Sequence, residues 1–353
     1  MSGSAGAEPR VLLDGTPLLG RRTGIGRYTA SLVAELASFV DVRLVGFTTR
    51  GWRELRSVVP AGTRAVGLPV PARAVRMLWR RSAFPPIELL AGRAAVVHGT
   101  NFVLPPSVRA GGVVTVHDLA FLDDPALADR DLAVLVRRSA HRAAVVCTPT
   151  AAVADVVSAR LDVPPEKIVV TPLGVDPEWF DATPLDAATR VHYGVPAEYL
   201  LFVGAEGPRK GLDVLLAAHG PDLPPLVIAG PSGAACGNGV IRTGYLPDNH
   251  LRGLVAGAAA LVLPSRDEGF GLPALEALAC GTPVVCTDIP ALREVTAGHA
   301  YRVPRGDAAA LNEALHHALT APPGREEGRA RARTFTWRTC AEKTLEAYRQ
   351  AAT

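Results

Sequence analysis

Cysteine and aromatic residues are scarce in this chain. The five cysteines are odd in number, and no two have the spacing of metal ligands: Cys147, Cys236, Cys280, Cys286 and Cys340. A cysteine-based metal site is therefore not expected, and we predict reduced, mostly buried thiols in a cytosolic protein. Aromatic residues make up only 5% of the chain and do not alternate with basic ones, so no base-stacking surface for nucleic acid is expected.

Long apolar runs and a strong net charge are also absent. The longest apolar stretch, Gly253–Pro264, falls well short of the roughly 20 residues that span a bilayer, so an integral membrane protein is not expected. The net charge of +3 is too small to favour nucleic acid as a partner. Residues 1–10 lack an apolar segment and are predicted to form a disordered tail rather than a signal peptide.

The composition and the order of apolar segments indicate a soluble globular protein with two domains. Hydrophobic residues make up 48% and charged residues 20% of the 353 positions, which is enough for two separate cores. Short apolar runs alternate with helical patterns in both halves, and this predicts α/β domains with parallel, doubly wound sheets. We predict an N-terminal Rossmann-like domain over residues 11–180, a second over residues 181–335 and a terminal helix over residues 336–353.

The predicted elements follow one another in a regular order. In the first half, we expect a helix from the glycine-rich loop at residue 24 to about Phe39, helices Asp131–Ala143 and Ala151–Leu161, and strands Val11–Asp14, Val42–Phe47, Ala94–His98, Val113–His117, Ala144–Thr148 and Ile168–Val170. Residues 60–86 are interpreted as irregular. In the second half, after a connector over residues 176–197, we expect strands Leu200–Val203, Leu226–Ala229, Val240–Thr243, Leu261–Pro264 and Val284–Cys286, helices Leu212–His219, Asn249–Ala256 and Trp337–Ala351, and a loop over residues 322–328.

The most specific pattern lies between residues 261 and 288. A predicted strand leads through Glu268 and the glycine-rich run 269–271 into a helix that ends at Gly281. Free N–H groups at such a helix start attract an anion. Glu276 lies about one turn into the helix, and its side chain leans back toward the same place. Two carboxylates beside an anion site favour a ligand that is part phosphate and part polyhydroxylated, such as a nucleotide sugar, although either acid alone could simply complement the helix dipole.

Two adjacent cations follow another predicted strand. Gly204 ends that strand, and Arg209 and Lys210 immediately precede a helix. Cations at the start of a helix are electrostatically unfavourable because the helix dipole is already positive there, and an anionic ligand would remove the conflict. The alternative interpretation is a pair of solvated turn residues.

Together, these two patterns resemble the signature of the retaining glycosyltransferases of family 4, which have the GT-B fold. The resemblance rests on Ser265, Glu268, Gly-Phe-Gly, Leu-Pro, Glu276 and Gly-Thr-Pro, and on glycine followed by Arg-Lys-Gly. It is strong from Phe202 to Asp288 and moderate before Asp176. It implies two Rossmann-like domains facing a cleft, with the C-terminal helix crossing back to the N-terminal domain.

The resemblance also implies roles for single residues. Glu268 would contact the donor sugar, Glu276 the nucleotide ribose, and Arg209 and Lys210 the donor diphosphate. Further donor contacts would come from Gly204 and from backbone groups near the base, sugar and phosphate: Leu246, Gly269, Phe270, Gly271 and Leu272. No Asp-any-Asp motif follows a strand, so we expect the two cations to replace a divalent metal, with no cofactor.

The N-terminal half carries weaker signals. The loop with Gly24 and Gly26 resembles the family's glycine-rich loop, but it does not match a dinucleotide fingerprint, because it lies too far from its strand. The phrase His117-Asp118-Leu, followed by Pro125, resembles a mannosyl- and rhamnosyltransferase-like group in which the histidine contacts the donor sugar. Asp118 could either orient His117 or bind backbone.

Candidate residues for binding the acceptor are chosen because they end or follow predicted strands. His98 and His117 both end predicted strands, so both are expected to face the cleft, although a lone histidine there is more often structural. His98, Asn101 and Asp118 are taken as acceptor-side candidates.

One basic segment offers a membrane contact. Arg73, Arg76, Arg80 and Arg81 surround apolar residues, and such a segment can lie on an anionic membrane surface. Packing of the arginine stems on the domain surface is the alternative, and we favour it.

The sequence therefore predicts a retaining, metal-independent glycosyltransferase. It would move a hexose, mannose-like or rhamnose-like, from a nucleoside diphosphate sugar to a hydroxyl acceptor such as a glycan, a glycolipid or a small-molecule natural product. It would act in the cytoplasm, in contact at most with the inner membrane face. The alternatives are a nucleotide-sugar-binding protein without transferase activity, an epimerase or a phosphorylase. A nicotinamide-dependent oxidoreductase is disfavoured because no strand leads directly into a three-glycine turn with an acid about 20 residues later.

Overall fold

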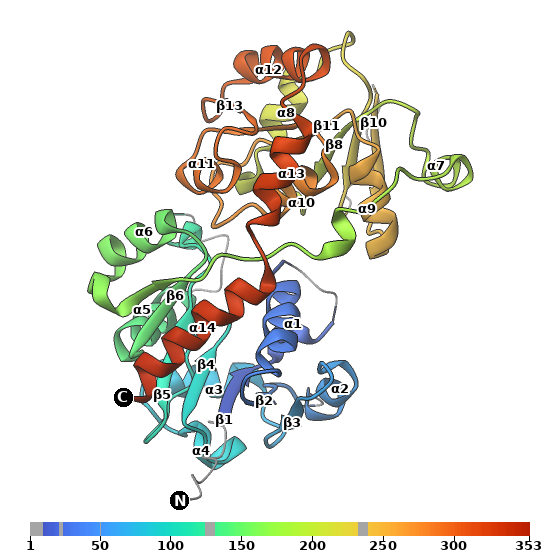
Figure 1. Ribbon diagram of the computed structural model, residues 1–353. Helices are drawn as coiled ribbons and strands as arrows, with labels where there is room; N and C mark the ends of the chain where they lie inside the picture. Colours follow the sequence, from blue (N-terminus) through green and yellow to red (C-terminus); the bar gives the residue numbers. More distant parts are fainter. Residues whose placement is uncertain (1–9, 21–23, 50, 124–130, 232–238) are drawn as a thin grey trace, which may run out of the picture. The chain divides into compact units, whose positions relative to one another are not determined.

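The computed structural model describes residues 10–20, 24–49, 51–123, 131–231 and 239–353 (Figure 1). Thr23 of the glycine-rich loop, Pro125 and Cys236 lie outside these ranges. The chain divides into two compact units: unit 1 comprises Met1–Gly174 and Trp337–Thr353, and unit 2 comprises Val175–Thr336. Each unit contains one parallel sheet with helices, which confirms the predicted α/β class in both halves. Within the described ranges, no helix combines the length and the hydropathy needed to cross a membrane.

Unit 1 has seven strands in the order β3-β2-β1-β4-β5-β6-β7. The strands are β1 (Arg10–Asp14), β2 (Asp41–Val45), β3 (Arg64–Val66), β4 (Val96–Gly99), β5 (Gly111–Thr115), β6 (Val145–Thr148) and β7 (Ile168–Val170). The helices are α1 (Gly24–Leu36), α2 (Gly51–Val58), α3 (Ala72–Trp79), α4 (Ile87–Ala91), α5 (Leu132–Arg142), α6 (Ala151–Leu161) and α14 (Trp337–Ala352). Strands β4 and β6 are buried along their whole length, as expected for a parallel sheet covered on both faces.

Unit 2 has six strands in the order β10-β9-β8-β11-β12-β13. The strands are β8 (Leu200–Val203), β9 (Leu226–Ala229), β10 (Val240–Gly244), β11 (Ala260–Leu263), β12 (Val284–Thr287) and β13 (Tyr301–Val303). The helices are α7 (Ala187–Tyr193), α8 (Leu212–Ala218), α9 (Asp248–Ala256), α10 (Leu272–Cys280), α11 (Pro290–Thr296), α12 (Ala308–Thr320) and α13 (Arg325–Arg333). The direction of strand succession reverses between β8 and β11, as it does between β1 and β4 in unit 1.

Two segments interpreted as loops contain regular structure. Residues 60–86 hold strand β3 and helix α3, and helix α13 begins at Arg325 within the predicted loop 322–328. The prolines of the first segment flank α3 rather than interrupt it, with Pro71 at its N-cap. Val75 and Trp79, four positions apart, are only 1% and 2% exposed, so one face of α3 is packed into the core. This packing stabilises α3, a short helix that the arginine-rich sequence did not predict.

Strand β5 begins two residues earlier than predicted because two glycines are part of it. A Cβ atom added at Gly111 would lie 2.0 Å from the carbonyl oxygen of Ala351, and one at Gly112 would lie 2.7 Å from a methyl group of Leu104. Glycine is therefore required where α14 and the chain after β4 approach this strand, although glycine usually weakens a strand.

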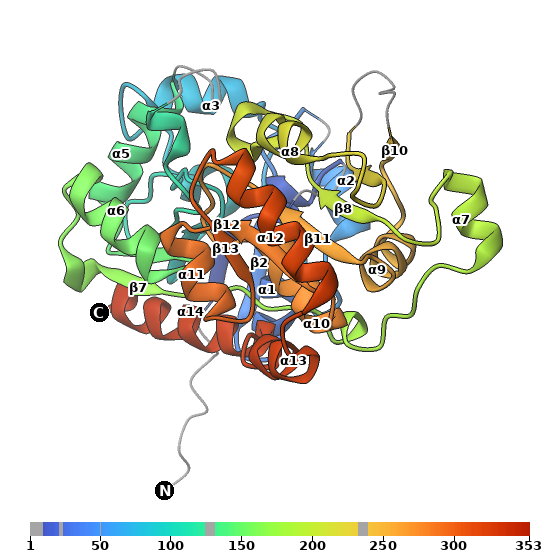
Figure 2. The same cartoon turned by 90° about the horizontal axis from the view of Figure 1, so that it is seen from above.

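The terminal helix α14 belongs to unit 1, as the resemblance implied. It packs against α1 and against strands β5, β6 and β7, and Figure 2 shows it running beside β7. Its inner face includes Tyr348, whose hydroxyl lies 2.7 Å from Nδ1 of His98. On its outer side, the Arg338 guanidinium lies 4.0 Å above the centre of the Phe39 ring. The C-terminus thus completes the cover of the N-terminal sheet.

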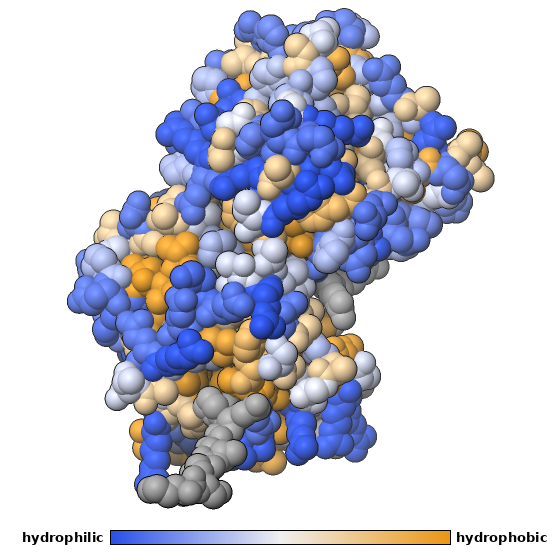
Figure 3. Space-filling model, viewed as in Figure 1, coloured by the Kyte–Doolittle hydropathy of each residue, from blue (hydrophilic) through white to orange (hydrophobic). Residues whose placement is uncertain are grey.

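Exposed apolar side chains are unevenly divided between the two units. Most of the large ones belong to unit 1, among them Met77 and Leu78 on α3, which are 50% and 42% exposed. On the face shown in Figure 3, the larger hydrophobic patches also lie over unit 1. Scattered exposed apolar residues are normal, but neighbours on one short helix form a small apolar surface.

Candidate functional site

The predicted donor residues come together at the carboxyl ends of β8 and β11. These strands are adjacent and parallel, with Leu200 and Leu201 paired to Ala260 and Leu261. The strand order reverses between them, and ligands of open α/β sheets bind at such points. The chain after β8 carries Arg209 and Lys210, and the chain after β11 carries Glu268.

Glycines allow these two segments to approach closely. Gly211 has a φ of +64°, and a Cβ atom there would lie 2.0 Å from the carbonyl oxygen of Pro264. Gly204 has a φ of +154°, and its N–H donates to the carbonyl oxygen of Ala229 at 2.9 Å. Both backbone conformations favour glycine. The turn of Arg209 and Lys210 is therefore held directly against the end of β11.

Glu268 is the centre of a charged cluster. Its Oε1 atom lies 2.6 Å from Nζ of Lys210 and accepts a hydrogen bond from Oγ of Ser265 at 2.7 Å. Its Oε2 atom lies 3.8 Å from a terminal nitrogen of Arg209. The side chain of Glu268 is only 7% exposed, and those of Arg209 and Lys210 are 26% and 19% exposed. The three predicted charges thus form one partly buried group.

The electrostatics keep Glu268 ionised. Burial alone would raise the pKa of Glu268, but the charges of Lys210 and Arg209 and the hydrogen bonds from Lys210 and Ser265 outweigh it. The net result is a pKa below the usual range. Two cations and one carboxylate leave a net positive charge beside the strand ends, which attracts an anion.

A second ion pair holds the cationic turn, and the sequence did not reveal it. The Arg266 guanidinium makes two hydrogen bonds to the carboxylate of Asp213, at 2.9 and 2.6 Å. The backbone N–H of Arg266 donates to the carbonyl oxygen of Arg209 at 2.8 Å, and its guanidinium also donates to the carbonyl of Pro208. Arg266 therefore pins the turn from its backbone and its side chain. The two residues of the ion pair lie far apart in sequence, and no local pattern marks them.

The glycine-rich run opens α10 as predicted. Gly271 has a φ of +92°, and a Cβ atom there would lie 2.4 Å from a methyl group of Leu292. Helix α10 then begins at Leu272, with proline in its first turn. Phe270 is buried and meets the ring of Phe335 edge-on, with the ring centres 5.6 Å apart. Glu276 lies in the second turn and is 2% exposed.

Arginines of α13 bind the opposite end of α10. Arg329 donates to the carbonyl oxygen of Ala279 at 3.0 Å, and Arg325 donates to that of Gly281 at 3.0 Å. Carbonyl groups at a helix C-terminus lack helical partners and carry partial negative charge, so cations there are stabilising. Both ends of the helix that carries Glu276 are thereby fixed.

The segment after β10 contains Leu246, which is 5% exposed; the backbone contact expected there stays a prediction. On β10 itself, Arg242 forms an ion pair with Glu206, which lies between Gly204 and Arg209 on the chain after β8. Glu206 and Arg242 were not among the predicted site residues.

Unit 1 has its own group of polar residues where the strand order reverses. Asp14 ends β1, and its Oδ1 atom accepts a hydrogen bond from the N–H of Thr16 at 2.9 Å. Burial raises the pKa of Asp14 even though that hydrogen bond lowers it. Asn101 follows β4, and its buried Oδ1 atom has no hydrogen-bond partner among the described residues. Gly24 and Gly26 lie in the first turn of α1.

The His98 side chain lies inside unit 1, although its position at a strand end predicted that it would face the cleft. Its ring is fully buried, with Nδ1 2.7 Å from the Tyr348 hydroxyl and Nε2 2.8 Å from Oγ1 of Thr115. Burial and the neighbouring His117 lower the pKa of His98 to about 3, so the ring is neutral. Position at a strand end did not reveal which face of the sheet carries the side chain, and that face is covered by α14.

His117 is nearly buried, at 8% exposure, between the rings of Tyr28 and Phe102. Its Nε2 atom lies 2.9 Å from the carbonyl oxygen of Thr100. Because a carbonyl can only accept, Nε2 carries the proton and Nδ1 is the acceptor of the ring. Burial lowers the pKa of His117, although Thr100 and Asp118 oppose this. Asp118 accepts a hydrogen bond from the N–H of Ala120 at 3.2 Å, so it binds backbone.

No cluster of three or more His, Cys, Asp or Glu side chains suited to a metal ion occurs in the ranges that the structure describes. The site residues form two groups, one in each unit. In unit 2, Arg209, Lys210 and Glu268 come together at one sheet edge. In unit 1, His117, Asn101 and Asp118 follow the carboxyl ends of β4 and β5, while His98 lies inside the unit.

Two protein families match most of the chain. The family described as "Glycosyl transferase 4-like domain" matches residues 23–174, and the family described as "Glycosyl transferases group 1" matches residues 197–321. The second match covers the residues that surround Glu268.

Individual proteins agree with these matches. The chain is 28% identical to O-antigen chain mannosyltransferase B of Escherichia coli, over 96% of this chain and 99% of that protein. It is 30% identical to D-inositol 3-phosphate glycosyltransferase of Frankia alni, over 68% of each. Among solved structures, it resembles sucrose-phosphate synthase from Thermosynechococcus elongatus, with a TM-score of 0.76, 21% identity, and 97% and 98% of the two chains covered. This last likeness concerns the fold.

Proposed function

Because the chain belongs to the GT-B glycosyltransferases, we propose that it is a retaining, metal-independent enzyme that transfers a hexose from a nucleoside diphosphate sugar to a hydroxyl group. One observation carries this proposal: Arg209 and Lys210 meet Glu268 where the strand order of unit 2 reverses. This arrangement supports the proposal that the two cations bind the diphosphate and that the acid binds sugar hydroxyls in one site. That the protein is a glycosyltransferase follows from the family, whereas the donor, the acceptor and the stereochemistry are our proposal.

The cations would act on the leaving diphosphate. When the bond between the anomeric carbon and the phosphate oxygen breaks, negative charge grows on the diphosphate. Arg209 and Lys210 are already oriented by Glu268 and by the turn that Arg266 holds, so little reorganisation is needed. Fixed charges of this kind lower the barrier more than mobile ones do.

Glu268 would hold the sugar rather than attack it. Its Oε1 atom is engaged by Lys210 and Ser265, and it is ionised. A carboxylate held this way accepts hydrogen bonds from sugar hydroxyls, with the backbone of Gly269–Leu272 beside it. We therefore propose front-face attack: the acceptor oxygen bonds to the anomeric carbon, the carbon–phosphate oxygen bond breaks, and the acceptor proton passes to the departing diphosphate.

His117 supports this proposal from unit 1. It is neutral and donates from Nε2 to Thr100, which makes Nδ1 its acceptor atom. A neutral imidazole that accepts at Nδ1 suits a sugar hydroxyl. Asn101, with its buried Oδ1 atom, suits a hydroxyl of the acceptor.

We favour mannose or a mannose-like sugar as the group transferred. The support is the resemblance of the segment around His117 and the similarity to a mannosyltransferase over nearly the whole chain. A glycan, glycolipid or other polyhydroxylated acceptor fits the relatives. Contact with the inner membrane face through residues 73–81 is supported by Met77 and Leu78, which are exposed beside Arg73 and Arg81 on and after α3.

Turnover of a panel of nucleotide sugars tests the proposal. We expect one donor, with guanosine diphosphate mannose the first choice, to release nucleoside diphosphate in the presence of a hydroxyl acceptor, with an α-linked product from an α-linked donor. Full activity should remain after treatment with a metal chelator. Tight donor binding without any turnover would favour the sugar-binding alternative, and inversion at the anomeric carbon would refute retention.

Binding of the nucleotide tests Glu276 separately. Because we assign Glu276 to the nucleotide ribose, Glu276→Ala should weaken the affinity for free nucleoside diphosphate about tenfold, as measured by calorimetry. Glu313→Ala on α12, where the side chain is 78% exposed, is the matched control. Unchanged binding in Glu276→Ala would assign this acid to the stability of α10.

A further inference from the structure

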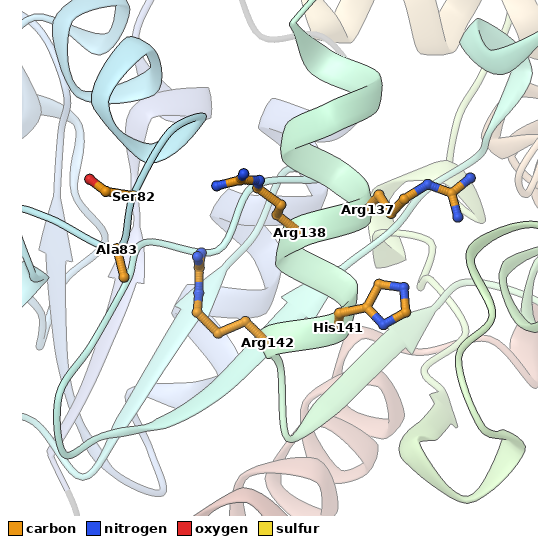
Figure 4. Close-up of a pocket in the computed structure, with 6 residues that line it drawn as sticks. All are labelled: Ser82, Ala83, Arg137, Arg138, His141 and Arg142. Carbon is orange, nitrogen blue, oxygen red and sulfur yellow. The ribbon is translucent and has the colours of Figure 1, made fainter.

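A cationic cavity lies in unit 1, at the C-terminal end of α5. It has a volume of about 580 Å³ and is lined by Ser82, Ala83, Arg137, Arg138, His141 and Arg142 (Figure 4). Four of these six residues are basic and none is acidic. Because α5 ends just before the amino end of β6, the cavity lies away from the carboxyl ends of the strands, where the transferase residues are found.

Two arginines of α5 point to the same side. Figure 4 shows that Arg138 and Arg142 extend toward Ser82 and Ala83, whereas Arg137 and His141 extend from other sides of the helix. Positions four apart on a helix are neighbours, so the two guanidinium groups repel each other. The charge of Arg137 is balanced by an ion pair with Asp162, whose carboxylate lies 3.4 Å away. Within the described part of the chain, no acidic side chain forms an ion pair with Arg138 or Arg142.

Arg142 is the less hydrated of the two. One terminal nitrogen donates to the carbonyl oxygen of Leu104, and its Nε atom is buried without a hydrogen-bond partner among the described residues. Burial and the charge of Arg138 lower the pKa of Arg142. A buried guanidinium donor without a partner is costly, and an anion bound beside the two arginines would offset the repulsion between their charges.

The helix dipole alone does not explain this pair. Cations near a helix C-terminus are stabilised by the negative helix end. Helical side chains, however, lean toward the N-terminus, so these guanidinium groups are carried back along α5 and away from its last carbonyls. Figure 4 shows Arg142 directed back along the helix in this way.

We propose that this cavity binds a phosphate group, with Arg138 and Arg142 as its main ligands and the Ser82 hydroxyl at its edge. Planar guanidinium groups match phosphate oxygens with paired donors, and the dianion of a phosphate ester would balance the two charges. The phosphate belongs either to a soluble ester or to a lipid headgroup, and both present the same oxygens. The site is separate from the donor diphosphate site and does not depend on the proposed function.

Local hydrogen exchange of the full chain tests this proposal with inorganic phosphate as the probe. Phosphate should slow exchange in peptides covering residues 78–84 and 131–143. In Arg138→Gln, which changes an exposed side chain, the half-saturating phosphate concentration for this protection should rise about tenfold or more. Arg64→Gln, an exposed cation on the edge strand β3, is the matched control and should behave like the wild type. Protection around residues 204–211 reports the donor site separately and should persist in Arg138→Gln.

Vesicles distinguish the two sources of phosphate. If phosphatidylcholine vesicles containing phosphatidic acid co-sediment the wild type but not Arg138→Gln, the site takes a lipid phosphate. If both proteins behave alike with vesicles while Arg138→Gln has lost the phosphate response, the site takes a soluble ester. Absence of phosphate protection at α5 in the wild type, or an equal response in Arg138→Gln, overturns the proposal.

Discussion

The two units share one topology but differ in the electrostatics of their strand ends. In unit 2, the reversal of strand order gathers two cations around an ionised acid, Glu268. In unit 1, the same place holds a buried acid, Asp14, whose pKa is raised, with Asn101 and a neutral histidine, His117, after the neighbouring strands β4 and β5. Two units with the same topology therefore differ in the charge at their strand ends, which agrees with the proposal of a diphosphate site in unit 2 and of hydroxyl contacts in unit 1.

Burial shifts the pKa values of titratable side chains in both units, and the charged or neutral groups around each side chain decide the net shift. Burial by itself would raise the pKa of Glu268, but Lys210 and Arg209 lower it, so the charge persists inside the protein. His117 and His98 are also buried, but their main partners are hydroxyl and carbonyl groups, and their pKa values fall. Charge is thus retained only where an opposite charge lies beside it.

The largest effect is expected from Lys210→Ala. This change removes a cation from the leaving diphosphate, and kcat should fall about a hundredfold or more. Lys343→Ala, which removes a half-exposed lysine of α14, is the matched control. Steady-state kinetics on protein shown to be folded by circular dichroism is the measurement. Near wild-type kcat in folded Lys210→Ala would contradict the assigned role.

Glu268→Gln should cost roughly 3 kcal/mol of unfolding free energy at pH 7, because it leaves two partly buried cations without their counter-charge. A carboxylate whose folded-state pKa is lowered contributes stability above its unfolded pKa of about 4.3, and this contribution is lost as pH falls through the folded pKa. The gap between wild type and variant should therefore shrink below about pH 4. Urea unfolding of both proteins, with Glu313→Gln as control, measures the gap; a gap independent of pH would refute the ion-pair explanation.

In unit 1, His98→Leu should reduce stability and leave catalysis intact. It leaves the buried hydroxyl of Tyr348 without its His98 partner, whereas Thr115 keeps a hydrogen bond to the Tyr28 hydroxyl; the loss costs about 1–3 kcal/mol. His317→Leu, at a 59% exposed position in unit 2, is the control. Thermal unfolding and kcat/KM are measured together. A fall in kcat/KM without loss of stability would return His98 to the acceptor side.

The smallest effect is expected from Arg266→Ala. The ion pair with Asp213 is exposed and adds little stability, but it orients the turn of Arg209. We expect a severalfold fall in kcat with little change in the unfolding free energy, and no further fall in Arg266→Ala/Asp213→Ala. Arg293→Ala, which breaks a similar exposed pair with Asp288, is the control. Equal effects of Arg266→Ala and Arg293→Ala would dismiss Arg266 as a positioning residue.

The comparison also shows what sequence can reveal. The strand–turn–helix around Glu268 could be predicted because its glycines, acid and helix signals are contiguous, and the family resemblance linked it to Arg209 and Lys210. The ion pair between Arg266 and Asp213 could not be predicted, because it joins residues 53 positions apart that no local pattern connects. His98 was misplaced for a similar reason: its partner Tyr348 lies 250 positions away, on the last helix.

The sequence also failed to predict several helices and strands. Helix α3 has only eight residues, and its prolines and arginines hide the apolar spacing of Val75 and Trp79. Helices α11 and α12 and strand β13 follow the most specific motif. Their local signals, Pro290 at the start of α11 and the Asp307 cap of α12, are individually weak, so the sequence alone did not predict these elements.

The clamp of α13 on the far end of α10 has a consequence for how the donor is recognised. Arg325 and Arg329 hold the C-terminal end of α10, whose N-terminal end begins at the glycine turn. Their hydrogen bonds oppose tilting of this helix. With Glu276 as the proposed nucleotide contact, substitutions of Arg325 or Arg329 are expected to change nucleotide affinity, although neither residue is proposed to touch the nucleotide.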